Sequence, residues 1–420
     1  QLAHQCVRHG ADVTGAHAFG NEWAGMGIGG YGNIIGRADP RYRNILSGNG
    51  QNGIQMGPGA NNNHIVGNYV GTDISGNARL GNLGWGISME NAAFNNVVQG
   101  NLVSGNDTTL LGGGLGIVIC GWGSDYNSII GNLVGTDASG LKAIPNASGV
   151  VVGCGAAFNR IGGTATGDAN LMSGNGHVGV SINQGKGNLV LGNLIGTTFS
   201  GDAALGNYVG VFVSTSDVET MVGGAIQEEG NLVSGNRSDG IVVEGDSNFV
   251  IGNHIGTNAS TSSSLPNGAR GIYVNGERNL LQGNLVAHSV LGPGVVVRTW
   301  PFNTIRRNSI YSNGSEGISL LDGSNQMMPA PILMSVTPIS VSGTACPGCT
   351  VEVFSDTQDE GHFYEGATIA DSTGNWLLIS DHSLSGPHAT ATATDQNGNT
   401  SEFSLPQIVW NWLYLPIIMR

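Results

Sequence analysis

The chain has 420 residues, including 71 glycines, and only 10% of its residues are charged. A mostly helical fold is excluded because glycine costs about 1 kcal/mol at each helical position, and collagen is excluded because the glycines have no three-residue period. The net charge of −14 disfavours nucleic acid, anionic membrane surfaces and acidic polysaccharides as partners. No apolar run reaches the about 20 residues that span a bilayer.

Residues 1–26 precede the regular part of the sequence and are predicted to be an N-terminal segment or a partial first coil. The first residue is Gln1 and no signal peptide precedes it, so a mature or truncated chain is expected. The segment contains no amphipathic helix that would cap a solenoid, and we therefore expect an uncapped end.

From residue 27 to residue 325 one pattern recurs, a glycine followed by apolar residues at the first and third positions after it. In the copy at Gly53 the apolar residues are Ile54 and Met56. This period of two is typical of a strand with one buried face. The starting glycines are Gly27, Gly53, Gly86, Gly116, Gly149, Gly179, Gly210, Gly240, Gly271, Gly294 and Gly317.

Repeats of this length, with glycine at the corners and asparagine at fixed offsets, predict the coils of a parallel β-solenoid. A leucine-rich repeat is rejected because its Leu-rich consensus is absent. Asparagine tolerates the left-handed backbone of corners, and asparagines stacked at one offset can hydrogen-bond from coil to coil. The candidates for such a ladder are Asn63, Asn96, Asn127, Asn159, Asn188, Asn248, Asn279 and Asn303.

The Gly-Asn-x-Ile/Val-x-Gly-Asn and Gly-Ile-x-Val runs resemble those of secreted bacterial right-handed parallel β-helix repeat proteins over residues 27–325. The resemblance implies an all-β fold, a right-handed parallel β-helix of roughly ten to eleven coils, in a bacterial protein that is extracellular or on the cell surface. It does not fix the function, because the same coil occurs in pectin-degrading enzymes, phage tailspikes and adhesins.

The repeat ends at residues 326–331, a predicted linker. Residues 332–405 alternate differently and contain turn clusters at 371–375 and 395–399, which predicts a small antiparallel β-sandwich. The run from Gly343 to Phe354 resembles bacterial Ig-like modules appended to secreted β-helix proteins. Residues 406–420 form an apolar C-terminal tail.

Four of the five cysteines suggest two disulfides. Cys346 and Cys349 form a Cys-x-x-Cys without a thioredoxin-like setting or a second pair of zinc ligands, so a structural disulfide is expected. Cys120 and Cys154 are predicted at nearly equivalent positions in adjacent coils. Their expected Cα separation lies within the range of about 4.4–6.8 Å that disulfides allow. Two buried free thiols are the alternative. Cys6 has no evident partner. The cysteines favour an oxidising, extracellular compartment.

A catalytic constellation is not visible in the sequence. Pectin hydrolases of the resembled architecture need paired carboxylates, and lyases need a calcium-binding Asp cluster plus a base. None of the outward positions of the Gly-Ile-x-Val strands is charged, and Asp73 and Asp137 are explained better as turn residues than as calcium ligands. No enzymatic activity, cofactor or metal is therefore expected. The outward positions are Gln55, Ser88, Val118, Val151, Ser181, Phe212, Val242, Tyr273, Val296 and Ser319.

Two apolar features suggest assembly. The outward positions become largely apolar along the stack and form a candidate lateral stripe that consists of Val118, Val151, Phe212, Val242, Tyr273 and Val296. The C-terminal tail is too short to span a membrane and would aggregate if it were free in water; it either packs on its own sandwich or adds a strand to another subunit. Its candidate assembly residues are Val409, Trp410, Trp412, Leu413, Tyr414, Leu415, Ile417 and Ile418.

Together these features predict a non-catalytic extracellular structural protein, a surface filament or sheath subunit that self-assembles into a homo-oligomer through its tail and rod ends. The alternatives are a polysaccharide-active enzyme, either a pectate-lyase-like lyase or a glycoside hydrolase, and an adhesin that binds an extracellular glycan. An adhesin predicts exposed aromatic residues near one loop edge, for which Trp122, Tyr126 and Trp85 are candidates.

Overall fold

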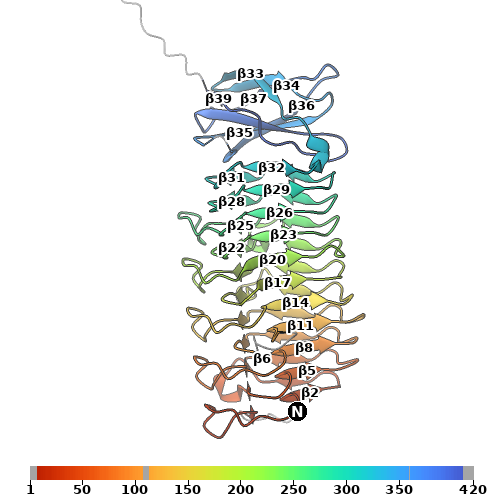
Figure 1. The fold of residues 1–420 in the computed structure, drawn as a ribbon, viewed down its shortest axis with the longest axis vertical. Coiled ribbons are helices and arrows are strands. Elements are labelled where there is room, and N and C mark those ends of the chain that lie inside the picture. The colour runs from red at the N-terminus through yellow and green to blue at the C-terminus, as the bar shows by residue number, and fades with distance from the viewer. Residues whose placement is uncertain (1–6, 107–112, 359, 410–420) are drawn as a thin grey trace, which may run out of the picture.

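The computed structural model describes residues 7–106, 113–358 and 360–409. Three long parallel sheets wind into a right-handed solenoid, and two small antiparallel sheets follow at its C-terminal end (Figure 1). The predicted all-β fold is confirmed. No helix within these ranges is long and apolar enough to cross a membrane.

Each complete coil contributes one strand to each sheet, in the order sheet I, sheet II, sheet III, while β1 precedes the first complete coil and β32 follows the last. Sheet I consists of β2 (Met26–Ile28), β5 (Ile54–Met56), β8 (Ile87–Glu90), β11 (Ile117–Cys120), β14 (Val150–Gly153), β17 (Val178–Ile182), β20 (Val209–Val213), β23 (Ile241–Val243), β26 (Ile272–Val274), β29 (Val295–Arg298) and β32 (Ile318–Leu321).

Sheets II and III complete the coils, and their strands are shorter. Sheet II consists of β3 (Ile34–Ile35), β6 (His64–Val66), β9 (Val97–Gln99), β12 (Ser128–Ile130), β15 (Arg160–Gly162), β18 (Leu189–Leu191), β21 (Met221–Gly223), β24 (Phe249–Ile251), β27 (Leu280–Gln282) and β30 (Thr304–Arg306). Sheet III consists of β1 (Arg8–His9), β4 (Ile45–Leu46), β7 (Tyr69–Val70), β10 (Leu102–Val103), β13 (Leu133–Val134), β16 (Leu171–Met172), β19 (Leu194–Ile195), β22 (Leu232–Val233), β25 (His254–Ile255), β28 (Leu285–Ala287) and β31 (Ser309–Tyr311).

The core of the rod is a continuous column of inward side chains. The apolar residues predicted from the period-two pattern, such as Ile54 and Met56, are fully buried, and each stacks in register on its equivalent in the next coil, Ile87 and Met89. Coils with equivalent residues in register bury one shared apolar column instead of many separate cores, which is why the repeat specifies the rod.

Asparagine ladders hold the corners of the coils. The Nδ2 group of Asn96 donates to Oδ1 of Asn127 at 3.0 Å, and Asn127 donates to Asn159 in the same way. The predicted ladder is therefore present at this corner, although Thr220 replaces asparagine in one coil. Two further ladders, one through Asn101 and one through Asn146, follow the other two corners.

The left-handed backbone lies one position earlier than predicted. The ladder asparagines themselves do not have positive φ; the residue before each often does, as at Tyr126 (φ 57°) and Phe158 (φ 55°). The ladder side chain must point inward to reach its neighbours, so the preceding residue makes the turn and its side chain points out of the rod.

The C-terminal sandwich is built from one three-stranded and one four-stranded antiparallel sheet. Trp376 and Leu378 of the first sheet pack on Val351, Val353 and other residues of the second. The strands are β33 (Ile332–Thr337), β34 (Ser340–Thr344), β35 (Thr350–Asp356), β36 (Phe363–Ile369), β37 (Asn375–Ile379), β38 (His388–Thr394) and β39 (Gln407–Ile408). Short 3-10 helices in the described ranges are η1 (Pro40–Tyr42), η2 (Gln227–Glu229) and η3 (Ser324–Met327).

The sandwich closes the C-terminal end of the rod. The last coil has backbone N–H groups with no following coil, and side chains of the sandwich accept their hydrogen bonds. Arg307 N donates to Glu352, Asn313 N to Glu360 and Leu320 N to Glu402, at 2.8–2.9 Å.

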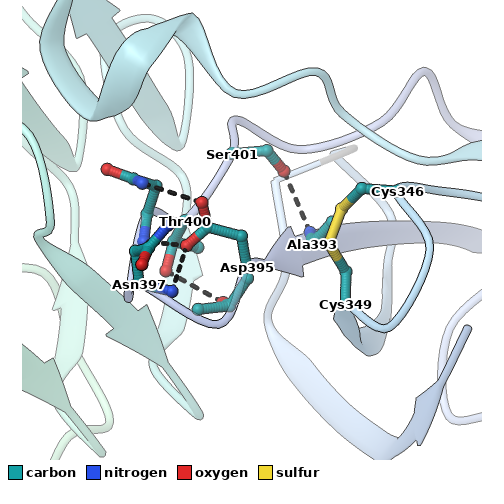
Figure 2. Close-up of a disulfide and its surroundings, with 9 residues drawn as sticks. Cys346, Cys349, Ala393, Asp395, Asn397, Thr400 and Ser401 are labelled. Carbon is teal, nitrogen blue, oxygen red and sulfur yellow. Dashed lines mark hydrogen bonds between the residues drawn. A yellow bond between two sulfur atoms is a disulfide. The ribbon is translucent and has the colours of Figure 1, made fainter.

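The turn of the sandwich that contains Asp395 adds to this closure. The Cys346–Cys349 disulfide lies next to this turn, on the side away from the rod (Figure 2). Asp395 Oδ1 accepts from the backbone of Asn397 and Asn399, which shapes the turn. Thr400 then reaches the last coil, where its hydroxyl accepts from Ile305 N at 2.9 Å. This end of the rod is therefore capped, and the edge of its sheets is covered.

Candidate functional site

Two aromatic side chains stack on the outside of the corner between sheets I and II. Tyr126 and Phe158 occupy the left-handed position just before the ladder asparagine in adjacent coils. Their ring centroids are 5.4 Å apart and the ring planes differ by only 12°. Phe158 lies over Gly187 of the next coil, where an added β-carbon would come within 2.7 Å of the ring. The absence of a side chain at Gly187 thus lets this ring lie flat on the rod.

Trp122 protrudes from the same corner and is 84% exposed. Its indole lies against Gly155 of the next coil, where an added β-carbon would be 2.8 Å from the ring. We call Trp122, Tyr126 and Phe158 the aromatic corner. Exposed large aromatic residues gathered at one place on a soluble protein mark a binding surface more often than chance.

A disulfide fixes the two coils that carry the aromatic corner. Cys120 and Cys154 are bonded, with Cα atoms 5.0 Å apart. Both predicted disulfides are therefore present in the structure; Cys6 lies outside the described residues. A covalent bond between the two turns limits their relative movement, and with it the movement of Trp122 relative to Gly155.

A shallow hollow lies beside the indole and combines one flat apolar wall with polar amides. Its amide groups come from Asn91 and Gln184, in the coils on either side of the disulfide. None of its lining residues is charged. The lining consists of Asn91, Cys120, Gly121, Trp122, Cys154, Gly155 and Gln184.

Glu90 precedes the lining residue Asn91 in sequence but does not itself line the hollow. It is the last residue of β8, points outward, and is in register with Cys120 of the next coil. Its Oε1 atom is buried and has no hydrogen-bond partner among the described residues. An unpaired buried acceptor costs about 1–3 kcal/mol.

This arrangement suits a sugar. Sugar rings have an apolar face that can lie on an indole and a rim of hydroxyl groups that pair with amides and carboxylates; binding sites generally combine apolar walls with a few placed polar groups. The sequence identified Trp122 and Tyr126 but missed Phe158 and the hollow. The signal for Phe158 was an aromatic residue directly before the ladder residue Asn159, as for Tyr126 before Asn127. The third candidate, Trp85, is only half-exposed and lies outside this corner.

The predicted lateral stripe does not form an exposed apolar surface. Val118, Val242 and Val296 are only 3%, 7% and 2% exposed, while Val151, Phe212 and Tyr273 are half-buried. Val242 lies in register between the two larger side chains Phe212 and Tyr273, which accounts for its burial. The stripe is therefore not a free contact surface.

Tyr273 is the centre of a second polar group on sheet I. The Arg270 guanidinium lies over its ring at 4.1 Å from the centroid and forms a bidentate pair with the buried Asp239. Arg298 donates to Asp322 at 2.6 Å, and this carboxylate, followed by the nearby Tyr273 phenol, raises the pKa of Arg298. The sequence placed Tyr273 outward but did not bring these arginines to it.

The turn aspartates behave as predicted. Asp137 Oδ1 accepts from the backbone N–H groups of Leu141 and Lys142 and from the Ser139 hydroxyl. Burial alone would raise the pKa of Asp137, but these hydrogen bonds outweigh it and lower the pKa. Within the described ranges, no group of three or more His, Cys, Asp or Glu side chains could hold a metal ion.

Only one of the candidate assembly residues of the tail is described. Val409 packs against the core of its own sandwich, and its N–H donates to Pro387 O at 2.8 Å. The others, from Trp410 onward, lie outside the described residues.

Comparison with known proteins gives one family match and several similar solved structures. The family described as right handed beta helix region matches residues 193–329, and no curated protein sequence matches the chain. The chain is similar to a double mutant of the periplasmic alginate epimerase AlgG, with 15% identity and a TM-score of 0.44 over 67% of this chain and 61% of that one. The chain thus spans less than two thirds of the length of AlgG.

Two other solved structures are similar over other spans. The enzymatically active domain of tailspike protein 2 from bacteriophage CBA120 is 12% identical, with a TM-score of 0.43 over 95% of this chain and 73% of that one. The A-module of the mannuronan C-5 epimerase AlgE4 from Azotobacter vinelandii is 12% identical, with a TM-score of 0.30 over 72% of this chain and 85% of that one. The three parallel sheets form a right-handed parallel β-helix, and the family match over residues 193–329 agrees with this fold.

The prediction of a self-assembling filament or sheath subunit is wrong. Head-to-tail assembly needs two open ends and the sandwich covers one of them, while the lateral stripe is largely covered.

Proposed function

We propose that this protein binds a polysaccharide outside the cell and does so at the aromatic corner. The observation that carries the proposal is the exposed Trp122 beside a hollow with two amide side chains, on coils that are joined by a disulfide and also carry the stacked Tyr126 and Phe158 rings. A rigid aromatic surface binds with little loss of conformational entropy, because the disulfide and the glycines have already fixed the rings. The two disulfides support an oxidising, extracellular location.

The proposal can be tested by affinity electrophoresis in gels that contain soluble polysaccharides. We expect retardation by at least one glycan, and Trp122→Ala should weaken binding about tenfold, as is usual for a central aromatic contact. Trp23→Ala is the matched control, because Trp23 is also exposed (69%) but lies in the first coil. Equal retardation of wild type and Trp122→Ala would remove the corner as the binding site.

We propose binding without cleavage as the primary activity. The second candidate is a polysaccharide-active enzyme, and the observation that favours it is the Tyr273 phenol between Arg270 and Arg298. A phenol beside guanidinium groups has the chemistry to donate a hydrogen bond to a substrate oxygen. If the wild type releases new chain ends from a bound glycan and Tyr273→Phe does not, the result would support the enzyme. If the wild type releases no chain ends, binding without cleavage remains as the proposed activity.

A further inference from the structure

We propose that the Cys120–Cys154 disulfide is a redox switch for the aromatic corner. Small thiols reduce it and thereby weaken glycan binding, and a bound glycan in turn disfavours its reduction. This inference rests on the proposed binding at the corner and adds the regulation of that site.

The disulfide is open to small molecules from the solvent. Cys154 is exposed and Cys120 is half-buried, and both residues line the hollow beside the Trp122 indole. In the second disulfide, by contrast, Cys349 is only 2% exposed. Thiol–disulfide exchange begins when a thiolate reaches one of the sulfur atoms, and exposed disulfides are therefore the labile and regulatory ones among protein disulfides.

Two small thiols supply the electrons for the reduction. The thiolate of the first attacks the exposed Cys154 Sγ, the S–S bond breaks, and Cys120 leaves as a thiolate that takes up a proton. The second attacks the mixed disulfide at the sulfur atom of the first, which forms the small-molecule disulfide and leaves Cys154 as a thiol. The two cysteines thus gain the two electrons that the small thiols lose, and they take up the two protons that the small thiols release.

Reduction loosens the turns and leaves the coils in place. β11 and β14 remain paired in register up to Cys120 and Gly153. Trp122 and Gly155 follow the two cysteines at the start of the turns, beyond the last strand pair, where the disulfide links the two coils. Without this link the indole loses part of its preorganisation over Gly155, and ordering it again costs free energy when a glycan binds.

A glycan in the hollow acts on the same equilibrium from the other side. Both cysteines belong to the lining, so a ligand there covers the oxidised disulfide. Binding and reduction are linked: if the reduced protein binds a glycan more weakly by some factor, saturation with that glycan disfavours reduction by the same factor. We expect a factor of about three, because the paired strands still hold the two turns close together.

The test uses the full chain with Cys346→Ser and Cys349→Ser, so that Cys120–Cys154 is the one described disulfide left to reduce. Affinity electrophoresis in hydroxyethyl cellulose, dextran, galactomannan and carboxymethyl cellulose selects a polysaccharide that retards the oxidised protein. Dithiothreitol should weaken this binding about threefold, and reoxidation should restore it. Alkylation followed by peptide mass spectrometry shows which cysteines are reduced, and circular dichroism shows whether the rod stays folded.

Two further measurements separate the switch from a general effect of the reductant. With Cys120→Ser and Cys154→Ser the chain should bind as weakly as the reduced protein and should not respond to dithiothreitol. In glutathione redox buffers, a saturating polysaccharide should shift the equilibrium of Cys120–Cys154 toward the disulfide about threefold and leave that of Cys346–Cys349 in the unsubstituted chain unchanged.

The outcomes distinguish the switch from the function on which it rests. Retardation by none of the four polysaccharides, or retardation that Trp122→Ala leaves intact, would contradict the proposed function and the switch with it. Retardation that requires Trp122 but is the same before and after the disulfide is reduced, or a disulfide that dithiothreitol does not open in the folded protein, would overturn the switch alone.

Discussion

The indole of Trp122 lies so close to Gly155 of the next coil that a β-carbon at position 155 would be 2.8 Å from the ring. The contact joins two turns that the Cys120–Cys154 disulfide also links. The orientation of an 84% exposed tryptophan is thus set by a glycine 33 positions later in the sequence. Preorganisation of this kind makes the aromatic corner a rigid surface rather than a set of loose side chains.

Gly155→Ala should therefore weaken glycan binding. The new methyl group displaces the indole, and the positive φ of 86° adds a backbone cost of about 1–2 kcal/mol. Affinity electrophoresis measures the first effect and thermal melting the second. Gly100→Ala is the control, because Gly100 also has a positive φ (64°) but no heavy atom near the added carbon; it should lose stability and keep its affinity. Equal affinity of the two variants would contradict the role of the Trp122–Gly155 contact.

Removal of the Cys120–Cys154 disulfide should lower both stability and affinity. The bonded residues are 34 positions apart, and closing a loop of that length stabilises a chain by up to about 4 kcal/mol. The parallel coils already restrain the two turns, so we expect about half of that for the double Cys→Ser variant, measured by chemical denaturation. The corresponding double variant of Cys346 and Cys349, far from the corner, should leave glycan affinity unchanged. Unaltered affinity without the first disulfide would show that the strands alone position Trp122.

Asn127→Ala should be among the most destabilising substitutions in the rod. Asn127 Nδ2 donates to Ala93 O and to Asn159 Oδ1, and Asn127 Oδ1 accepts from Asn96, all within 3.0 Å. Alanine leaves these buried groups unpaired, at a cost of about 1–3 kcal/mol each, so we expect a loss of at least 3 kcal/mol in the free energy of unfolding. The exposed Asn77→Ala should cost less than about 1 kcal/mol. A loss below 1 kcal/mol at Asn127 would mean that the ladder contributes little.

The stability of the capped end should depend on pH through Glu352. Burial raises the pKa of this carboxyl, and the hydrogen bond from Arg307 N offsets only part of that effect. A folded-state pKa above the unfolded value means that folding favours the protonated form. The stabilisation that protonated Glu352 contributes is therefore complete below the usual carboxyl pKa of about 4.3. It is lost as the pH rises through the higher pKa that Glu352 has in the folded protein.

When the pH is raised from 4 to 7, the free energy of unfolding should therefore fall less in Glu352→Gln than in the wild type, because the amide of the variant does not ionise. Glu360, whose pKa burial also raises, should respond in the same direction when it is changed to Gln. Urea denaturation at both pH values, monitored by Trp376 fluorescence in the sandwich, measures the difference. Parallel changes in wild type and variant would show that Glu352 does not cause the pH dependence.

The sequence predicted the rod because its determinants repeat. Ile54 and its equivalents alternate with period two, and the ladder asparagines recur at fixed offsets, so each coil supplies the same information again. The disulfide of Cys120 and Cys154 followed from the same register. The candidate site depended on what does not repeat, namely Phe158 and Gly187, which come together only when the corner turn is known.

The prediction of an exposed lateral stripe was wrong for a related reason. Alternation indicates that Val242 points outward, but exposure depends on neighbours in the adjacent coils, and Phe212 and Tyr273 flank it there. The closure of the rod by Glu352 and Glu360 was also beyond prediction, because it joins residues of two different folding units through backbone N–H groups that carry no sequence signal.

Oxidative footprinting of the tryptophans by mass spectrometry, with and without a glycan that retards the protein, tests the central claim most directly. We expect the bound glycan to slow the oxidation of Trp122 several-fold and to leave Trp23 and Trp300, which are exposed elsewhere on the rod, unchanged. Equal oxidation of Trp122 in the free and bound protein, or protection of Trp23 or Trp300 instead, would contradict binding at the aromatic corner.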